Sequence, residues 1–124
     1  VAAGEHHLCV HKDFKGYYVT SEPGEKVSGH CPSVDVMFES VAECAKDKAI
    51  GVILTGMGAD GAKGLYAMKK AGAYTIGQDA ESCVVYGMPK VAFNIGGVIK
   101  QCPLEEIDDE IIKSLRTNNQ KQGE

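Results

Sequence analysis

The sequence predicts an α/β fold in which a parallel, doubly wound sheet carries helices on both of its faces. An apolar run at Ile50–Leu54 is followed by a glycine-rich turn and then by a helix-like stretch at Ala62–Ala71. A second β-rich run, Ala73–Gly77, comes directly after that stretch. Two strands joined by a helix form a right-handed parallel crossover. The turn is therefore expected at the carboxyl edge of a sheet, where open α/β folds bind their ligands.

The first third of the chain predicts a hairpin followed by a helix. Short strands are expected at His7–Val10 and Gly16–Thr20, on either side of a turn at Asp13–Gly16. Proline and glycine residues mark Ser21–Pro32 as a loop. Ser33 is the expected N-cap of the next helix, because apolar residues then recur at the spacing of one helix face. These residues are Val34, Met37, Phe38, Val41, Ala42 and Ala45.

The rest of the chain predicts alternating strands and helices. The run at Ile50–Leu54 contains β-branched residues without alternation, which predicts a strand buried on both faces. Gly72 is the expected left-handed residue that ends the helix after it. Four further segments are expected beyond Ala73–Gly77. They are a short helix at Met88–Asn94 with Pro89 in its first turn, a short strand at Val98–Lys100, a helix at Leu104–Leu115, and a polar tail at 117–124 that leaves 1–116 as the folded portion.

Composition excludes several classes of protein. The chain has 124 residues, which fits one domain or part of one, and 13 basic against 17 acidic residues give a net charge of −4. No basic stripe with interleaved aromatic residues points to nucleic acid. No apolar run is long enough to span a membrane, and no signal peptide is visible. The chain begins abruptly, in what resembles the end of a strand, so we expect the sheet to be incomplete on its N-terminal side.

Cysteine and histidine usage argues against a metal site. The number of cysteines is five, which is odd, and they are widely spaced without a Cys-x-x-Cys pair. We therefore expect buried free thiols in a cytoplasmic protein rather than disulfides or a zinc site. The four histidines lack ligand spacing, so we expect surface or turn positions for them and no metal or cofactor. They are His6, His7, His11 and His30.

The glycine-rich turn allows two interpretations. The pattern Gly56-x-Gly58-x-x-Gly61, with Asp79 about 20 residues further on, is that of a dinucleotide-binding module. Asp60 argues against it, because a carboxylate at the expected N-cap would occupy the helix N–H groups and repel a phosphate. Asp60 is then either a helix cap or the acid that orients a histidine in a Ser-His-Asp triad.

Several ordered segments resemble the chemotaxis protein-glutamate methylesterases, the CheB family. The resemblance extends over roughly residues 1 to 116, and its segments follow one another in the family's order. They are Val1–Leu8, His30–Asp35, Gly51–Leu65 with its Thr-Gly-Met-Gly-Ala-Asp-Gly motif, Ala71–Ile76, and Ser82–Pro89.

The resemblance implies a doubly wound α/β domain that hydrolyses glutamate methyl esters on chemoreceptors and deamidates certain receptor glutamines. It implies a Ser-His-Asp triad without metal or cofactor, in which Asp60 matches the acid and Met57 matches a residue lining the active site. The implied partners are the cytoplasmic domain of a methyl-accepting chemoreceptor, a receiver domain and the N-terminal half of the esterase domain. The implied location is the cytoplasm.

The family's serine and histidine precede the segment that matches Val1, so this chain is expected to lack esterase activity by itself. None of its six serines matches the nucleophile motif, and His30 belongs to a different motif from the family's histidine. Two alternatives remain. One is a nucleotide-binding module that uses Gly56, Gly58, Gly61 and Asp79, and the other is a non-catalytic interaction domain.

Overall fold

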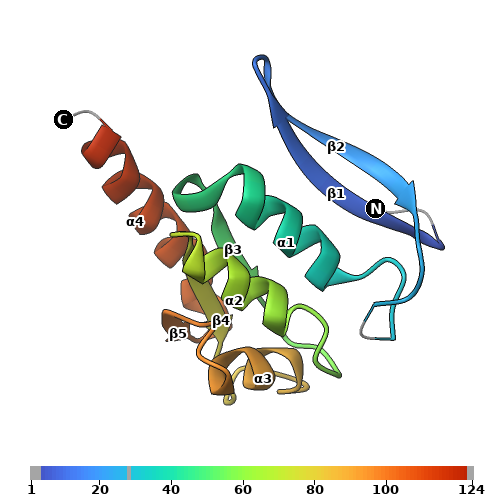
Figure 1. Ribbon diagram of the computed structural model, residues 1–124. Helices are drawn as coiled ribbons and strands as arrows, with labels where there is room; N and C mark the ends of the chain where they lie inside the picture. The colour runs from blue at the N-terminus through green and yellow to red at the C-terminus, as the bar shows by residue number, and fades with distance from the viewer. Residues whose placement is uncertain (1–3, 28, 123–124) are drawn as a thin grey trace.

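The computed structural model describes residues 4–27 and 29–122 and contains a hairpin, a short parallel sheet and four α-helices in that part of the chain (Figure 1). In chain order the elements are β1 (His6–Asp13), β2 (Gly16–Pro23), α1 (Val34–Cys44), a short 3-10 turn η1 (Lys46–Lys48), β3 (Ile50–Ile53), α2 (Ala62–Lys70), β4 (Tyr74–Gln78), α3 (Met88–Asn94), β5 (Lys100–Cys102) and α4 (Leu104–Gln122).

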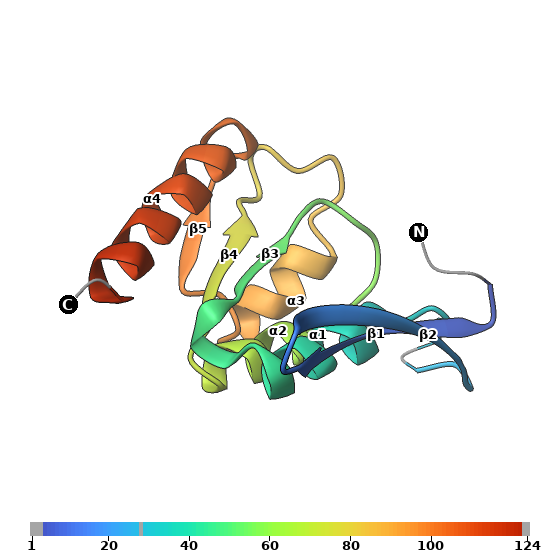
Figure 2. The same cartoon turned by 90° about the horizontal axis from the view of Figure 1, so that it is seen from above.

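The parallel sheet has the order β3-β4-β5 and is covered by helices on both faces. Figure 2 shows α4 on one side of the sheet and α1, α2 and α3 on the other. Each face has its own apolar core. Ile53, Leu65 and Met68 belong to the core beneath α1–α3, and Ile76, Cys102 and Ile107 form the core beneath α4. The predicted fold class is confirmed.

Strand β3 is buried on one face only, so the prediction of a strand buried on both faces is wrong. Its burial alternates: Gly51 and Ile53 are buried, whereas Ile50 and Val52 are half-buried. The buried face lies against α2, where a Cβ on Gly51 would approach the Leu65 side chain to 2.6 Å. The half-buried face lies at the rim of the core beneath α4, because β3 is an edge strand of this sheet.

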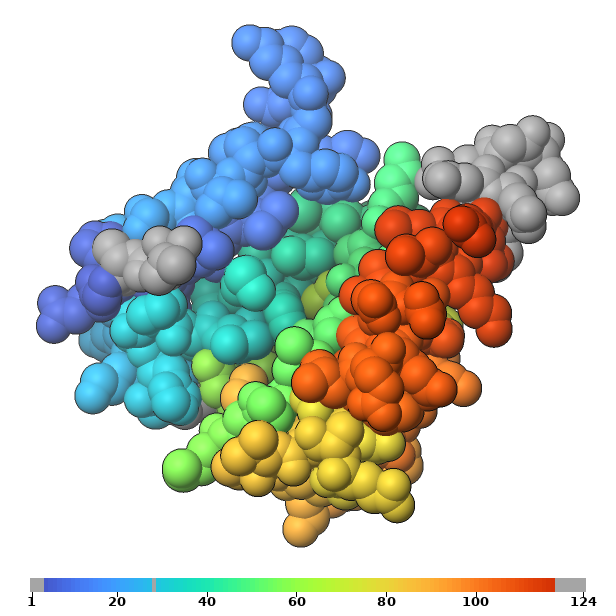
Figure 3. Space-filling model, turned by 180° about the vertical axis from the view of Figure 1, so that it is seen from behind, coloured from blue at the N-terminus to red at the C-terminus, as the bar shows by residue number. Residues whose placement is uncertain are grey.

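The hairpin is longer than predicted and lies against α1. Strands β1 and β2 pair antiparallel from His6 opposite Pro23 to Asp13 opposite Gly16, so the connection has only two residues. Hydrogen bonds join β1 to α1. The backbone N–H of Val10 donates to Ser40 Oγ at 2.8 Å, and the Cys44 thiol donates to the Val10 carbonyl at 3.6 Å. The hairpin projects well beyond the rest of the molecule (Figure 3).

Several predicted boundaries need correction. Gly72 has the expected positive φ, +106°, after α2. The last strand is Lys100–Cys102 rather than Val98–Lys100, because Val98 instead packs beside Gly77. The backbone of α4 stays helical to Gln122, past the predicted end at Leu115, and 123–124 lie outside the described residues. No helix in the described part of the chain is both long and apolar enough to cross a bilayer.

Candidate active site

The glycine-rich turn leaves the carboxyl end of β3 and is held by a second loop. The Gly56 N–H donates to the Val85 carbonyl at 3.0 Å, and the Gly56 carbonyl accepts from Gly87 and Met88. A Cβ on Gly87 would lie 2.6 Å from the Gly56 carbonyl oxygen, so the two loops approach closely enough to require glycine there. The buried Gln78 side chain, at the end of β4, adds a bond from the Thr55 N–H at 2.8 Å.

Asp60 is buried at this edge of the sheet, and its carboxylate has a fixed orientation. Only 6% of its surface is exposed. Its Oδ1 accepts from the Ser33 hydroxyl at 2.8 Å and from the Asp35 N–H at 3.1 Å. Its Oδ2 accepts from the Val34 N–H at 2.8 Å. The carboxylate therefore lies on the free N–H groups at the start of α1, where the helix dipole favours a negative charge.

The prediction that Asp60 caps its own helix is wrong. The N-cap of α2 is Gly61, with φ +103°, and the acid that closes this helix is Asp35 from the first turn of α1. Asp35 Oδ1 accepts from the Gly61 N–H at 3.0 Å and from the Gly64 N–H at 2.8 Å. Each of the two helices thus begins on a carboxylate that belongs to the other segment.

Close contact between α1 and α2 makes this exchange possible. A Cβ on Gly64 would lie 2.6 Å from the Phe38 Cβ and 3.0 Å from the Asp35 Cα, so only glycine lets the helices meet here. Asp35 itself is 2% exposed. No sequence pattern around Asp35 indicates this role, although Gly64, an isolated glycine inside the next helix, is a signal of close packing there.

Ser33 and His7 lie close to Asp60, but the geometry of these three residues is not that of a Ser-His-Asp triad. The Ser33 hydroxyl donates to Asp60 and not to a histidine. His7 Nδ1 accepts from the Ser33 backbone N–H at 3.2 Å, and His7 Nε2 lies 2.6 Å from the Glu25 carbonyl. Because Nδ1 accepts, the ring proton is on Nε2 and is donated to Glu25. The imidazole therefore has no free nitrogen with which to accept a proton from Ser33.

Met57 lies in the same turn as Asp60 but points outward, with 82% of its surface exposed. Val84, in the loop that clamps the turn, is 91% exposed. The Thr55 hydroxyl and the Val85 backbone hydrogen-bond to each other at 2.8 and 3.1 Å, which fixes the backbone beside Val84. The structure thus places a buried acid and an exposed apolar rim on one pair of loops.

The structure argues against the nucleotide-binding alternative. A pyrophosphate would need the free N–H groups at the start of α2, yet those of Gly61 and Gly64 are already bonded to the Asp35 carboxylate. The Asp79 carboxylate is also already engaged, and not with a ribose. Its Oδ1 accepts from both the N–H and the hydroxyl of Ser82, at 3.0 and 2.7 Å, and so closes its own turn.

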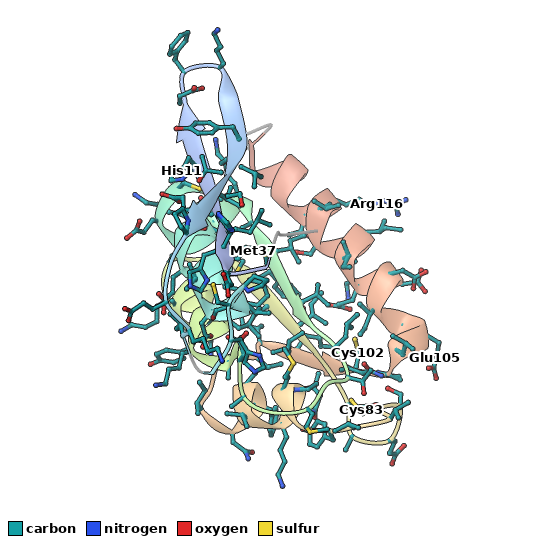
Figure 4. The ribbon with its side chains drawn as sticks, turned by 90° about the vertical axis from the view of Figure 1, so that its right-hand side faces the viewer. His11, Met37, Cys83, Cys102, Glu105 and Arg116 are labelled. Carbon is teal, nitrogen blue, oxygen red and sulfur yellow. The ribbon has the colours of Figure 1, made fainter. Side chains whose placement is uncertain are left out.

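The cysteines and histidines differ in part from their predicted surroundings. All five cysteines are free thiols, but only Cys102 is buried and the other four are half-buried. Burial raises the pKa of the Cys83 and Cys102 thiols. Both lie at the carboxyl end of the sheet, near the start of α4 at Glu105 (Figure 4). His30 is exposed in its loop as predicted, but His7 is 7% exposed, so the surface prediction is wrong there.

The described residues contain no group of three or more metal-ligating side chains that could hold an ion. A cavity of about 360 Å³ lies at the amino-terminal edge of the sheet, lined in part by Tyr74, Glu110 and Lys113. It is at the opposite edge from Asp60. Burial and the nearby Glu110 carboxylate raise the pKa of Tyr74 to about 12. This cavity therefore does not belong to the carboxyl-edge site.

The fold and the carboxyl-edge acid place the chain among open-sheet, doubly wound α/β domains. The chain belongs to the CheB methylesterase family, whose model matches residues 1–111. A crystal structure of the Thermotoga maritima CheB methylesterase catalytic domain superposes with a TM-score of 0.85 at 36% sequence identity, over 90% of this chain and 59% of that one. The resemblance read from the sequence is confirmed.

Curated relatives give the same result. A protein-glutamate methylesterase/protein-glutamine glutaminase of Syntrophomonas wolfei is 58% identical over 115 residues, which cover 93% of this chain and 34% of the relative. A protein of the same description from Caulobacter vibrioides is 62% identical over 89 residues, which cover 72% of this chain and 26% of the relative. The chain thus spans about a third or less of the length of these relatives.

Proposed function

We propose that this chain supplies the acid of a Ser-His-Asp triad in a protein-glutamate methylesterase and glutaminase. The observation that carries the proposal is the buried, anchored carboxylate of Asp60 at the carboxyl edge of the sheet. Asp60 also occupies the motif position that matches the family's acid. The serine and histidine of this triad are residues other than Ser33 and His7, whose geometry is unsuitable.

In the reaction, the histidine takes the proton of the serine hydroxyl while the serine oxygen attacks the carbonyl carbon of the glutamate methyl ester. The tetrahedral intermediate expels the methoxy group, which takes the proton from the imidazolium and leaves as methanol. Water then repeats the sequence on the acyl-enzyme and releases glutamate. With a glutamine side chain the leaving group is ammonia. Asp60 holds the imidazole in one tautomer and stabilises its charged form.

Met57 contributes to the surface that meets the substrate. The relatives are named for action on glutamate and glutamine side chains of proteins, and an exposed apolar rim at Met57 and Val84 suits a protein substrate rather than a small ester. The substrate class is the cytoplasmic domain of methyl-accepting chemoreceptors, with a receiver domain as the regulatory partner and the cytoplasm as the location.

The test is an Asp60→Asn substitution in a protein that joins this chain to the family's serine and histidine. Loss of the orienting carboxylate is expected to lower kcat for methanol release from methylated receptor by about 10⁴-fold. An amide in place of the carboxylate keeps the shape of the side chain, and a denaturant unfolding curve verifies that the variant is folded. Turnover equal to the wild type in a folded variant would rule the proposal out.

Asp79→Asn is the matched control, because it makes the same chemical change at the same edge of the sheet. The Asp79 carboxylate accepts hydrogen bonds from Ser82 in its own turn, so the kcat of the variant is expected to stay within about threefold of the wild type. An equal loss in both variants would show that the effect comes from general disturbance of this edge and not from the acid of a triad.

A further inference from the structure

The carboxylate of Asp60 has nearly all of its acceptor positions filled. A carboxylate offers about four lone-pair positions, two on each oxygen. Oδ1 uses both, for the Ser33 hydroxyl and the Asp35 N–H. Within the described part of the chain, Oδ2 accepts one hydrogen bond, from the Val34 N–H. One position on Oδ2 is therefore left for a donor that comes from elsewhere.

We propose that Ser33 is a positioning residue whose hydroxyl, together with the first amides of α1, turns Asp60 so that this remaining position of Oδ2 receives the imidazole N–H. The inference rests on the proposed function, in which Asp60 orients a histidine. It assigns separate tasks to the two oxygens. Oδ1 anchors the side chain, and Oδ2 accepts the bond from the base in addition to one anchoring bond from the Val34 N–H.

Ser33 does not behave as an ordinary helix cap. A serine at this position usually accepts a hydrogen bond from an amide of the helix that it precedes. Here the Ser33 side chain makes no such bond, and Asp60 takes those amides instead. The hydroxyl proton points at Asp60 Oδ1, 2.8 Å away. The Ser33 side chain therefore contacts Asp60 and does not cap α1 itself.

The serine is itself held from the opposite side. Its backbone N–H donates to His7 Nδ1, and His7 Nε2 lies 2.6 Å from the Glu25 carbonyl. Ser33 is 2% exposed and His7 is 7% exposed, so water does not compete for these bonds. The terminal torsion of an aspartate is soft on its own. The chain of contacts from Glu25 through His7 and Ser33 removes that freedom from Asp60.

The test compares Ser33→Ala with Ser40→Ala in the protein that carries the complete triad. Ser33→Ala removes one buried, charge-assisted bond to Asp60 and is expected to lower kcat about tenfold with KM unchanged. Ser40 also lies in this segment and has two hydrogen bonds, to Val10 and Met37. Removal of the Ser40 hydroxyl likewise breaks hydrogen bonds of α1 but is expected to leave kcat within about twofold of the wild type.

The same substitution in an Asp60→Ala background separates positioning from structure. If Ser33 acts through Asp60, Ser33→Ala is expected to change the residual kcat by less than about twofold there. A tenfold loss in that background, a rise in KM in place of a fall in kcat, or a Ser33→Ala variant that matches Ser40→Ala would overturn the inference. Full activity of Asp60→Ala would instead refute the proposed function.

The orientation of the Asp60 carboxylate can also be tested in the wild-type protein, without any variant. Couplings across hydrogen bonds, measured by NMR between the Val34 and Asp35 amide nitrogens and the Asp60 carboxyl carbon, are expected to be present. Their absence would show that the carboxylate is not held in the proposed orientation, and it would overturn the inference independently of the kinetics.

Discussion

Two regions of the molecule satisfy their polar groups in opposite ways: the starts of α1 and α2, beside Asp60, and the tip of the β1–β2 hairpin. At the helix ends, two buried carboxylates accept backbone N–H groups from segments 25 or more positions away. At the tip, the ladder of the hairpin bonds the backbone, and the side chains lie in water, with Phe14 94% exposed. His7, the only buried residue in β1 and β2, joins the hairpin to the helix ends. Substitutions in the two regions should therefore differ greatly in their energetic effect.

The largest effect on stability is expected at Asp35. Asp35→Ala leaves the N–H groups of Gly61 and Gly64 without their acceptor in a buried position, and this should lower the free energy of unfolding by about 3 kcal/mol. Urea unfolding at constant m-value measures the change. Asp47→Ala, at an exposed aspartate in η1, is the control and is expected to cost less than about 0.5 kcal/mol. Similar losses in both variants would contradict the comparison.

A smaller, chemical effect is expected within the hairpin at Cys9. Burial, reinforced by a hydrogen bond to Glu22 and by its charge, raises the pKa of the Cys9 thiol to about 11. The reactive thiolate is therefore scarce at pH 8, and alkylation should accelerate as the pH rises toward that value. Glu22→Gln removes the neighbouring charge and lowers the pKa, so iodoacetamide should label Cys9 several-fold faster, by roughly threefold to tenfold.

Labelling is followed by peptide mass spectrometry, which separates Cys9 from the other four cysteines. Glu25→Gln is the control, because that exposed glutamate side chain is not among the groups that shift the Cys9 pKa. An unchanged rate in Glu22→Gln, or an equal gain in Glu25→Gln, would show that Glu22 does not suppress the thiolate.

The smallest effect is expected at the hairpin tip. Phe14→Ser removes an exposed ring that lies beneath the Lys15 ammonium, 5.7 Å from the ring centroid. Exposed pairs of this kind contribute little, so the unfolding free energy should change by less than about 0.5 kcal/mol. A loss above about 1 kcal/mol in urea unfolding would mean that the tip is packed in solution, and the contrast with Asp35 would fail.

Local patterns were sufficient to predict most of the elements. The period of three and four from Val34 predicted α1, and Gly72 marked the end of α2 through its positive φ. The shift of the last strand to Lys100–Cys102 depends on how Val98 packs beside Gly77, which no local pattern encodes. The burial of His7 was missed for a similar reason, since both ring nitrogens are satisfied by distant backbone groups.

The sequence predicted that Asp60 lies at the carboxyl edge of the sheet, but not which groups surround it. The motif around Asp60 identified a carboxylate at the carboxyl edge of the sheet, and the structure places it there. The identity of the helix that it closes depends on contact between α1 and α2, and that contact in turn depends on the missing side chain at Gly64. A carboxylate next to a helix start predicts a local cap, and only the tertiary structure shows that the caps are exchanged.

The exchanged carboxylates couple the opening of the two helices. Asp35 travels with α1 but closes α2, and Asp60 precedes α2 but closes α1. Fraying at the start of one helix would leave buried N–H donors of the other helix without their acceptor. The first turns of α1 and α2 therefore cannot loosen separately. The amide protons at both starts should therefore exchange with deuterated solvent as one cooperative unit, at a rate governed by separation of the helix pair.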